Sequence, residues 1–285
     1  MLGERLMQNK IGSIVAIEPE TGEILCLVSS PNFDPHLMIG RQRGNNHLML
    51  QRDKRKPLLN RALMGAYPPG STFKTAQGLV FLQEGIIQEN TPVFPCSHGF
   101  NYGSLHVGCH GHASPLPLIP AIATSCNSYF CWGLFRMLGD RKYGSPQNAL
   151  TVWKDHMVSQ GFGYRLDVDL PGEGRGFIHN AGVYDKAYRG RWNGLTIISI
   201  SIGQGEILAT PLQIANLGAT IANRGHFTPP HIVKEIQDGE LDSIYRTPRV
   251  PTIERQYYEE IVTGNAVEAI VNGLQNFVVR IIKGE

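Results

Sequence analysis

The sequence predicts an α+β fold, and three observations support that prediction. Short apolar, β-branched runs within residues 12–28 and at 231–236 are typical of strands. Between these runs lie segments whose apolar residues recur at helical spacing. The chain has 285 residues and 42% hydrophobic content, enough for one large domain or two small ones. Strands distant in the sequence are expected to meet in a sheet that carries the helices as an insert.

The expected elements follow from composition and spacing. Residues 12–30 should form a β-hairpin, because two apolar runs flank the turn sequence Glu18-Pro19-Glu20-Thr21-Gly22. The polar, basic residues 31–60 are expected to be loop, and residues 91–117 lack helical spacing. Helices are expected at 72–84, 117–124, 128–138, 149–160, from Pro211 to a stop at Gly225, and at about 256–274, with a strand at 231–236.

Charge and cysteine content exclude several classes of protein. The net charge of +2 implies no polyanionic partner such as nucleic acid. No apolar run approaches the roughly 18 residues of a membrane span, and no signal peptide is recognised. Five cysteines are an odd number, so a framework with every cysteine in a disulfide is excluded, while one or two pairs stay open.

The most informative stretch is Tyr67-Pro68-Pro69-Gly70-Ser71-Thr72-Phe73-Lys74, which places a serine three residues before a lysine. A serine hydroxyl is a poor nucleophile until a neighbouring base takes its proton, and residues i and i+3 share a helix face. Lys74 can therefore serve as the base for Ser71 in a serine acyl-transfer enzyme. The alternative is a serine that caps a helix beside a solvated lysine.

A second polar segment, Thr124-Ser125-Cys126-Asn127-Ser128, lies between two apolar helical segments. A hydroxyl and an amide two residues apart can face the same side of a tight turn. Ser125 can then relay a proton, and Asn127 can hold a substrate amide. The alternative is that Ser125 or Asn127 caps the following helix.

These two segments, with the residues around them, resemble the transpeptidase domain of class B penicillin-binding proteins. Within that group they are similar to the elongation-type members, the penicillin-binding protein 2 group. The resemblance spans about residues 10–236. Further matching segments are Asn60-Arg61-Ala62, Asp169-Leu170-Pro171-Gly172-Glu173 and Ile202-Gly203-Gln204-Gly205.

The resemblance implies a penicillin-binding protein and serine β-lactamase-like fold, an antiparallel sheet flanked by helices with a helical insert. Residues 1–285 would form a single partial transpeptidase domain, incomplete at its C-terminus. About 75–195 would be a mostly helical subdomain, and 10–74 with 196–285 a sheet-containing one. By the same resemblance, the membrane anchor and the pedestal domain of the complete family protein would be absent from these 285 residues. That complete protein works at the periplasmic face of the bacterial inner membrane.

The resemblance also assigns roles. Ser71 would be the acylated nucleophile, Lys74 its general base, and Ser125 with Asn127 the second side of the site. The substrate would be the D-Ala–D-Ala end of a peptidoglycan stem peptide, which β-lactams mimic, and catalysis would require no cofactor. Expected partners are the membrane glycan polymerase and the elongation scaffold proteins. Two alternatives stay open: a serine β-lactamase or β-lactam sensor, and a non-catalytic scaffold or binding fragment of the same fold.

One family motif is missing from the sequence. The family carries Lys-Thr-Gly on a strand after the helix near 256–274, whereas the only Lys-Thr pair here is Lys74-Thr75. That strand supplies the second oxyanion donor, and losing one such donor lowers the rate on the order of 10²–10³-fold. The expectation is therefore that these 285 residues have little or no transpeptidase activity.

A group of potential metal ligands falls between the two motifs. Cys96, His98, Cys109, His110 and His112 lie within 17 residues of a glycine-rich stretch. Zinc prefers four such ligands in a tetrahedron, and some elongation-type members of the family hold zinc in this loop with other ligands. The hypothesis is a structural zinc on Cys96, Cys109, His110 and His112, with His98 as the alternative histidine. A Cys96–Cys109 disulfide and unlinked loop residues are the other interpretations. We interpret the remaining cysteines near the second motif, Cys126 and Cys131, as small core residues.

Overall fold

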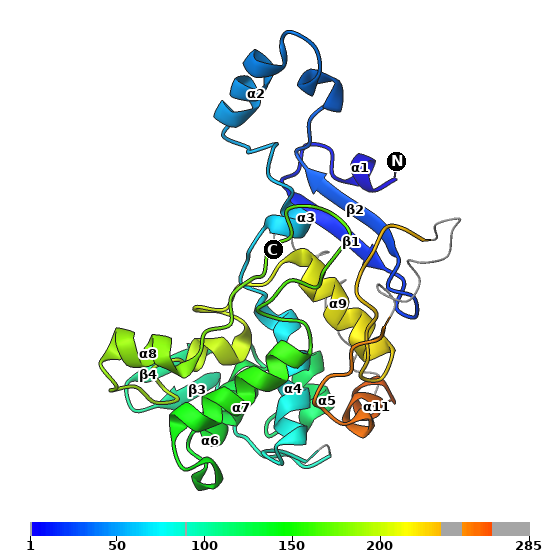
Figure 1. Ribbon diagram of the computed structural model, residues 1–285. Coiled ribbons are helices and arrows are strands. Elements are labelled where there is room, and N and C mark those ends of the chain that lie inside the picture. The colour runs from blue at the N-terminus through cyan, green and yellow to red at the C-terminus, as the bar shows by residue number, and fades with distance from the viewer. Residues whose placement is uncertain (1, 89, 235–246, 264–285) are drawn as a thin grey trace.

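The computed structural model describes residues 2–88, 90–234 and 247–263. These residues form an N-terminal β-hairpin and a body of packed helices that carries a second, shorter hairpin (Figure 1). The strands are β1 (Gly12–Ile17), β2 (Ile24–Ser30), β3 (Gly99–Tyr102) and β4 (Leu105–Gly108). The α-helices are α1 (Leu2–Leu6), α2 (Arg43–Arg52), α3 (Arg61–Met64), α4 (Lys74–Gln83), α5 (Leu118–Ala123), α6 (Asn127–Leu138), α7 (Pro146–Ser159), α8 (Ala181–Tyr188), α9 (Pro211–Ala222) and α11 (Arg255–Thr263). The 3-10 turns are η1 (Pro35–Met38), η2 (Gly70–Phe73), η3 (Arg141–Tyr143) and η4 (Ile198–Ile202).

The predicted β-hairpin at 12–30 is confirmed. Strands β1 and β2 pair antiparallel, with Ile14 opposite Val28. Gly22 ends the turn at φ +80°, a conformation that glycine adopts without strain. Helix α9 packs against β1 and joins the hairpin to the helical body (Figure 1).

The strongly patterned helices also occur where the sequence predicts them, as α4, α5, α6, α7 and α9. Helix α9 begins with a capping box: the Thr210 side chain accepts the Gln213 N–H, and the Gln213 side chain accepts the Thr210 N–H. Every residue of α4 from Lys74 to Leu82 is buried. Helix α4 therefore runs through the core, and its first residue lies at the base of the candidate site.

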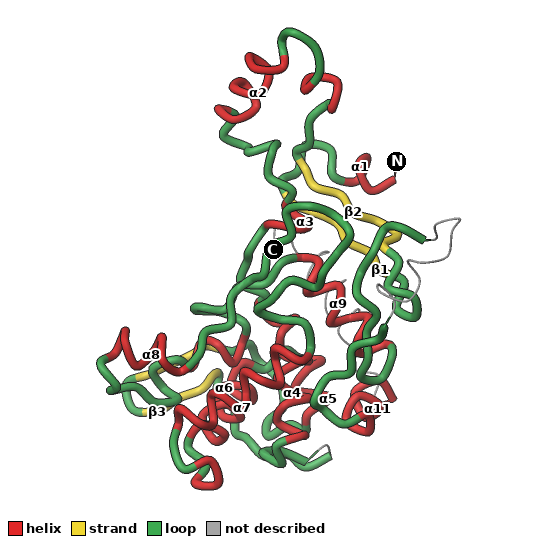
Figure 2. Tube along the Cα trace, in the orientation of Figure 1, coloured by secondary structure: helices red, strands yellow, loops and turns green. Residues whose placement is uncertain are grey.

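Regular structure occurs in the expected loop at 31–60 and also in residues 91–117, which lack helical spacing. Residues 31–60 hold η1 and α2. Only Leu50 of α2 is buried, and the sequence of this helix accordingly shows almost no apolar periodicity. Residues 91–117 hold the β3–β4 hairpin, whose four-residue strands are bordered by glycines and carry little strand signal. Figure 2 shows these two strands apart from the β1–β2 pair, and α2 projecting from the body.

The C-terminal predictions have mixed outcomes. The expected strand at 231–236 is wrong for its described part, because residues 231–234 contribute only a bridge between His231 and Glu23, and 235–236 lie outside the described residues. The helix expected at 256–274 is α11 up to Thr263, and the remainder lies outside the described residues. Helix α8 and turn η4 are additional elements. None of the described helices has the length and apolarity to span a bilayer.

Candidate active site

The site begins at the turn that leads into α4. Gly70 adopts φ +59°, and Ser71 follows it in η2 with an exposed side chain. Lys74, at the start of α4, is only 1% exposed. The turn thus presents the Ser71 hydroxyl to solvent, while the lysine side chain lies within the protein.

A chain of hydrogen bonds connects the two residues. Lys74 Nζ donates to the Ser125 carbonyl at 2.7 Å, to Ser125 Oγ at 2.9 Å and to Asn127 Oδ1 at 2.6 Å. Ser125 Oγ donates to Ser71 Oγ at 2.8 Å. Among the described contacts, Lys74 therefore reaches Ser71 through Ser125. The structure brings the four residues singled out in the sequence into one network.

The environment of Lys74 favours loss of its proton. Burial lowers the pKa of Lys74 from its ordinary value of 10.5 to about 8, because the charged ammonium is poorly solvated inside the protein. About a tenth of the molecules would then carry a neutral amine at pH 7. A neutral Lys74 can accept a proton from Ser71 by way of the Ser125 hydroxyl.

The second polar segment forms the turn between α5 and α6. Ser125 has φ +53°, which is uncommon for a residue with a side chain and is a form of backbone strain found at functional sites. Asn127 opens α6, and its Nδ2 donates to the Gly108 carbonyl at 2.9 Å. That bond directs the Asn127 Oδ1 toward Lys74. Strand β4 thereby supports the polar face of the site.

The turn before Ser71 is anchored from the other side by η4 and the residues after it. The Gly70 N–H donates to the Gly203 carbonyl at 2.8 Å. The backbone of Tyr67 exchanges two hydrogen bonds with Ala209, of 3.0 and 2.8 Å. Gly203, in the Gly203-Gln204-Gly205 segment, therefore holds Gly70, the residue that directly precedes Ser71.

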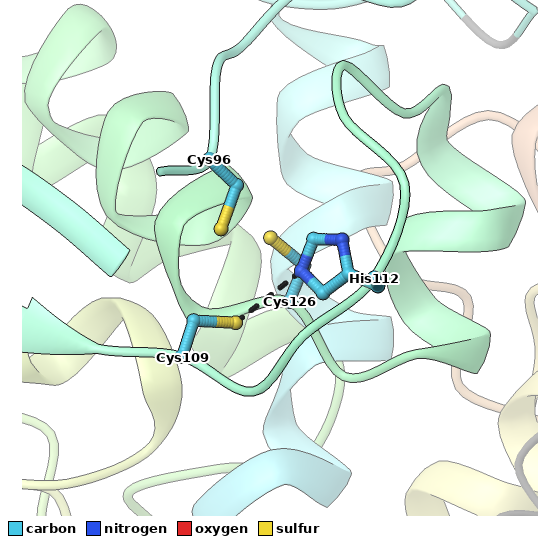
Figure 3. Close-up of side chains that lie close together, drawn as sticks. All are labelled: Cys96, Cys109, His112 and Cys126. Carbon is cyan, nitrogen blue, oxygen red and sulfur yellow. Dashed lines mark hydrogen bonds between the residues drawn. The ribbon is translucent and has the colours of Figure 1, made fainter. Parts of the chain in front are cut away.

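A cluster of potential metal ligands lies beside this network (Figure 3). The ligand atoms of Cys96, Cys109, His112 and Cys126 all lie within 4.8 Å of one another. Cys109 Sγ is 3.4 Å from His112 Nε2. A zinc ion with bonds of about 2.3 Å to sulfur and 2.0–2.1 Å to nitrogen separates these atoms by about 3.6 Å in a tetrahedron. The donor set therefore fits a closed structural zinc site.

The candidate ligand group in the structure differs from the one expected from the sequence. His110 is not a member, because its Nε2 lies 2.8 Å from the Thr124 carbonyl oxygen. His98 lies outside the cluster as well. The fourth candidate ligand is Cys126, which is buried in the core as the sequence predicts and also turns its Sγ toward the cluster. Its place between Ser125 and Asn127 was the available signal, but no zinc spacing rule includes that position.

The thiols of the cluster differ in acidity. Burial raises the pKa of Cys96 and of Cys126. Burial also opposes ionisation of Cys109, but hydrogen bonds from His112 and from the backbone N–H of Asn127 hold its pKa below the usual range. All five cysteines of the chain are unpaired, so the Cys96–Cys109 disulfide is not formed in the structure.

Comparison with known proteins gives a consistent family. Residues 12–279 match the family model described as the penicillin binding protein transpeptidase domain. A curated relative named peptidoglycan D,D-transpeptidase MrdA, from Acinetobacter baumannii, is 32% identical over 252 residues. That match covers 87% of this chain and 36% of the relative. The chain thus spans little more than a third of that relative's length.

Solved structures agree with this match. A crystal structure of Pseudomonas aeruginosa PBP2 in complex with WCK 5153 superposes with a TM-score of 0.76 at 28% identity, covering 92% of this chain and 58% of that one. A complex between PBP2 and MreC from Helicobacter pylori superposes with a TM-score of 0.75 at 27% identity, covering 92% and 46%. These likenesses confirm the α+β fold expected from the sequence.

Proposed function

Because the chain belongs to the penicillin-binding protein transpeptidase family, we propose that it forms the acyl-transfer site of a peptidoglycan D,D-transpeptidase that acts in cell elongation. The observation that carries the proposal is the hydrogen-bonded path from Ser71 Oγ through Ser125 Oγ to the buried Lys74. A solvated lysine could not serve as a base near neutral pH, whereas this one has a pKa of about 8.

The reaction proceeds in two steps. Ser71 Oγ attacks the carbonyl of the penultimate D-alanine, and its proton passes through Ser125 to neutral Lys74. The peptide C–N bond then breaks, and the terminal D-alanine leaves with a proton returned from Lys74. An amine of a neighbouring stem peptide next attacks the Ser71 ester and gives up one proton as the serine hydroxyl is restored. The Ser71 backbone N–H is one oxyanion donor for both tetrahedral intermediates.

Asn127 supports this chemistry in two ways. Its Oδ1 accepts from Lys74 at 2.6 Å and so orients the amine. Its side-chain amide lies on the same turn as Ser125, where it can meet the backbone of a bound stem peptide. A β-lactam offers the same carbonyl to Ser71, and its ring keeps the leaving group attached.

We also propose a structural zinc held by Cys96, Cys109, His112 and Cys126. The zinc would fix the position of Cys126, which lies between Ser125 and Asn127 in the sequence. It would also fix Cys109, whose Sγ accepts the Asn127 N–H at 3.3 Å. Three thiolates and one imidazole leave no open position for substrate, so the ion would contribute folding stability and take no part in the chemistry.

The ligand group in the structure contains Cys126, whereas the group expected from the sequence contains His110. This difference allows the zinc proposal to be tested. Elemental analysis of protein purified without chelator should find about one zinc per chain. The Cys126→Ser variant should lose most of it, whereas His110→Ala should keep it. Loss of zinc in His110→Ala with retention in Cys126→Ser would contradict the geometry and restore the set expected from the sequence.

Labelling with a fluorescent penicillin tests the nucleophile. The 285 residues contain no Lys-Thr-Gly sequence, so labelling should be slow and substoichiometric in short incubations, but dependent on Ser71. Ser71→Ala should abolish it, while Ser104→Ala, an exposed serine between β3 and β4, should not change it. Equal labelling of Ser71→Ala and the unmodified chain would refute the assignment. Rapid stoichiometric labelling would overturn the expectation drawn from the missing motif.

The same experiment separates the alternatives. Steady turnover of a chromogenic β-lactam would favour a serine β-lactamase, and no Ser71-dependent labelling at any time would favour a non-catalytic scaffold. We propose that the whole protein acts at the periplasmic face of the inner membrane. Its proposed partners are an elongation scaffold protein, as the complex of the Helicobacter pylori relative with MreC suggests, and a membrane glycan polymerase, as the family resemblance implies.

A further inference from the structure

A completely buried glutamine joins the nucleophile helix to two other elements. Gln77 is 0% exposed and lies one turn after Lys74 in α4. Its Nε2 donates to the Ile200 carbonyl in η4 at 3.2 Å, and its Oε1 accepts from Trp153 Nε1 in α7 at 2.7 Å. Trp153 and Ile200 are each 1% exposed. A buried amide bonded at both ends fixes its neighbours, because an unpaired polar group in the interior is unfavourable.

The Ile200 carbonyl leads back to the nucleophile. It also accepts the N–H of Gly203, the residue directly after η4, at 3.2 Å. The Gly203 carbonyl accepts the N–H of Gly70 at 2.8 Å, and Gly70 directly precedes Ser71. Gly203 has φ +68°, and a Cβ at this position would collide with the Gly70 carbonyl oxygen. The two glycine segments therefore lie at a separation that no side chain allows.

We propose that Gln77 is a positioning residue for acyl transfer at Ser71, acting through Ile200 and Gly203 on Gly70, the residue that directly precedes Ser71. The Gly70 carbonyl carbon is bonded to the nitrogen of Ser71, whose N–H is the proposed oxyanion donor. Gln77 itself is buried and does not meet substrate. The inference rests on the proposed function of Ser71. Displacing a catalytic group by about 1 Å can lower a rate on the order of 10²-fold, which sets the scale of the expected effect.

Two variants separate the positioning role from general stability. Gln77→Leu removes both hydrogen bonds and leaves the Ile200 carbonyl without its side-chain donor. Trp153→Phe removes the bond to α7 and keeps the bond from Gln77 to Ile200. Both should lower the melting temperature, because each leaves a buried polar group unpaired. Only Gln77→Leu should change the turn that carries Ser71.

The rate of acylation by a fluorescent penicillin, measured over a concentration series, tests this difference. Gln77→Leu should lower the limiting acylation rate about 10–100-fold with the noncovalent dissociation constant within about threefold, and Trp153→Phe should lower that rate less than about threefold. A wild-type limiting rate in Gln77→Leu would overturn the inference. Rate losses in both variants proportional to their losses of melting temperature would do so as well.

A third variant provides a pH signature and a substitute should Gln77→Leu not fold. In Gln77→Glu the neutral acid can still accept from Trp153 and donate to Ile200, but the carboxylate cannot donate. Burial favours the neutral acid. The acylation rate of Gln77→Glu relative to the unmodified chain at the same pH should therefore rise as the pH falls. A ratio independent of pH would contradict the proposal.

Amide hydrogen exchange at Gly70 reports the same link without any chemistry at Ser71. Its N–H should exchange about tenfold faster in Gln77→Leu and at an unchanged rate in Trp153→Phe. Unchanged exchange in Gln77→Leu contradicts the inference whether or not penicillin reacts. Faster exchange together with no acylation of the unmodified chain would sink the proposed function and leave the positioning link standing.

Discussion

The lowered pKa of Lys74 predicts how the acylation rate depends on pH. Only the neutral amine can accept the Ser71 proton, and burial brings the pKa of Lys74 to about 8. The neutral fraction is then about 1% at pH 6, about 9% at pH 7 and about 90% at pH 9. The initial rate of penicillin labelling should rise about 90-fold between pH 6 and pH 9 and level off above the pKa.

An assay with two lysine variants isolates the effect. Lys74→Arg should remove labelling at every pH, because a guanidinium stays protonated. Lys186→Arg changes an exposed lysine of α8 and should leave the profile unaltered. A rate that is flat from pH 6 to pH 9 would refute the role of Lys74 as base. A rate still climbing tenfold per unit beyond pH 9 would show an ordinary, solvated lysine.

Three further perturbations have expected outcomes. Removing zinc with a chelator should lower both the melting temperature and the rate of penicillin labelling, and added zinc should restore both. No change in either quantity would contradict the proposal that a metal supports Ser125 and Asn127. Gly133→Ala should lower the free energy of unfolding, measured in urea, by about 1–3 kcal/mol, because the added Cβ would collide with the Phe81 ring. As the control, Gly218→Ala places its Cβ in open space on α9 and should raise the free energy of unfolding by about 0.5–1 kcal/mol. A more stable Gly133→Ala and a less stable Gly218→Ala would contradict the described packing of α6 on α4. Thr210→Ala should lower unfolding free energy by about 0.5–2 kcal/mol, as it removes the side-chain acceptor that caps α9, and an unchanged value would refute that role.

Sequence reasoning located the catalytic candidates because both lie on strong local signals. Ser71 and Lys74 stand at the start of an apolar helix after a Pro-Pro-Gly turn, and Ser125 with Asn127 stands at the break between two apolar helices. Helix breaks of this kind can be recognised in a sequence because turn residues interrupt the regular helical spacing of the apolar residues. Their meeting across the fold came from the family resemblance, since no local rule joins residues more than 50 positions apart.

What the sequence did not predict depends on tertiary contacts. Helix α2 has almost no buried face, so it gives no apolar period to recognise. Cys126 was missed as a candidate metal ligand because it meets Cys96, Cys109 and His112 only where the chain returns at α6, which spacing along the sequence does not encode. Gln77 reads as one polar residue in a helix, and only the fold reveals that its partners are Trp153 and Ile200.

The central claim is that Ser71 is the nucleophile, activated through Ser125 by Lys74. The most direct measurement is peptide mapping by mass spectrometry after prolonged incubation of the chain with benzylpenicillin. Cleavage after Arg61 and Lys74 releases residues 62–74, and this peptide should carry the acyl adduct on Ser71. An adduct on any other peptide, or its persistence in Ser71→Ala, would contradict the account.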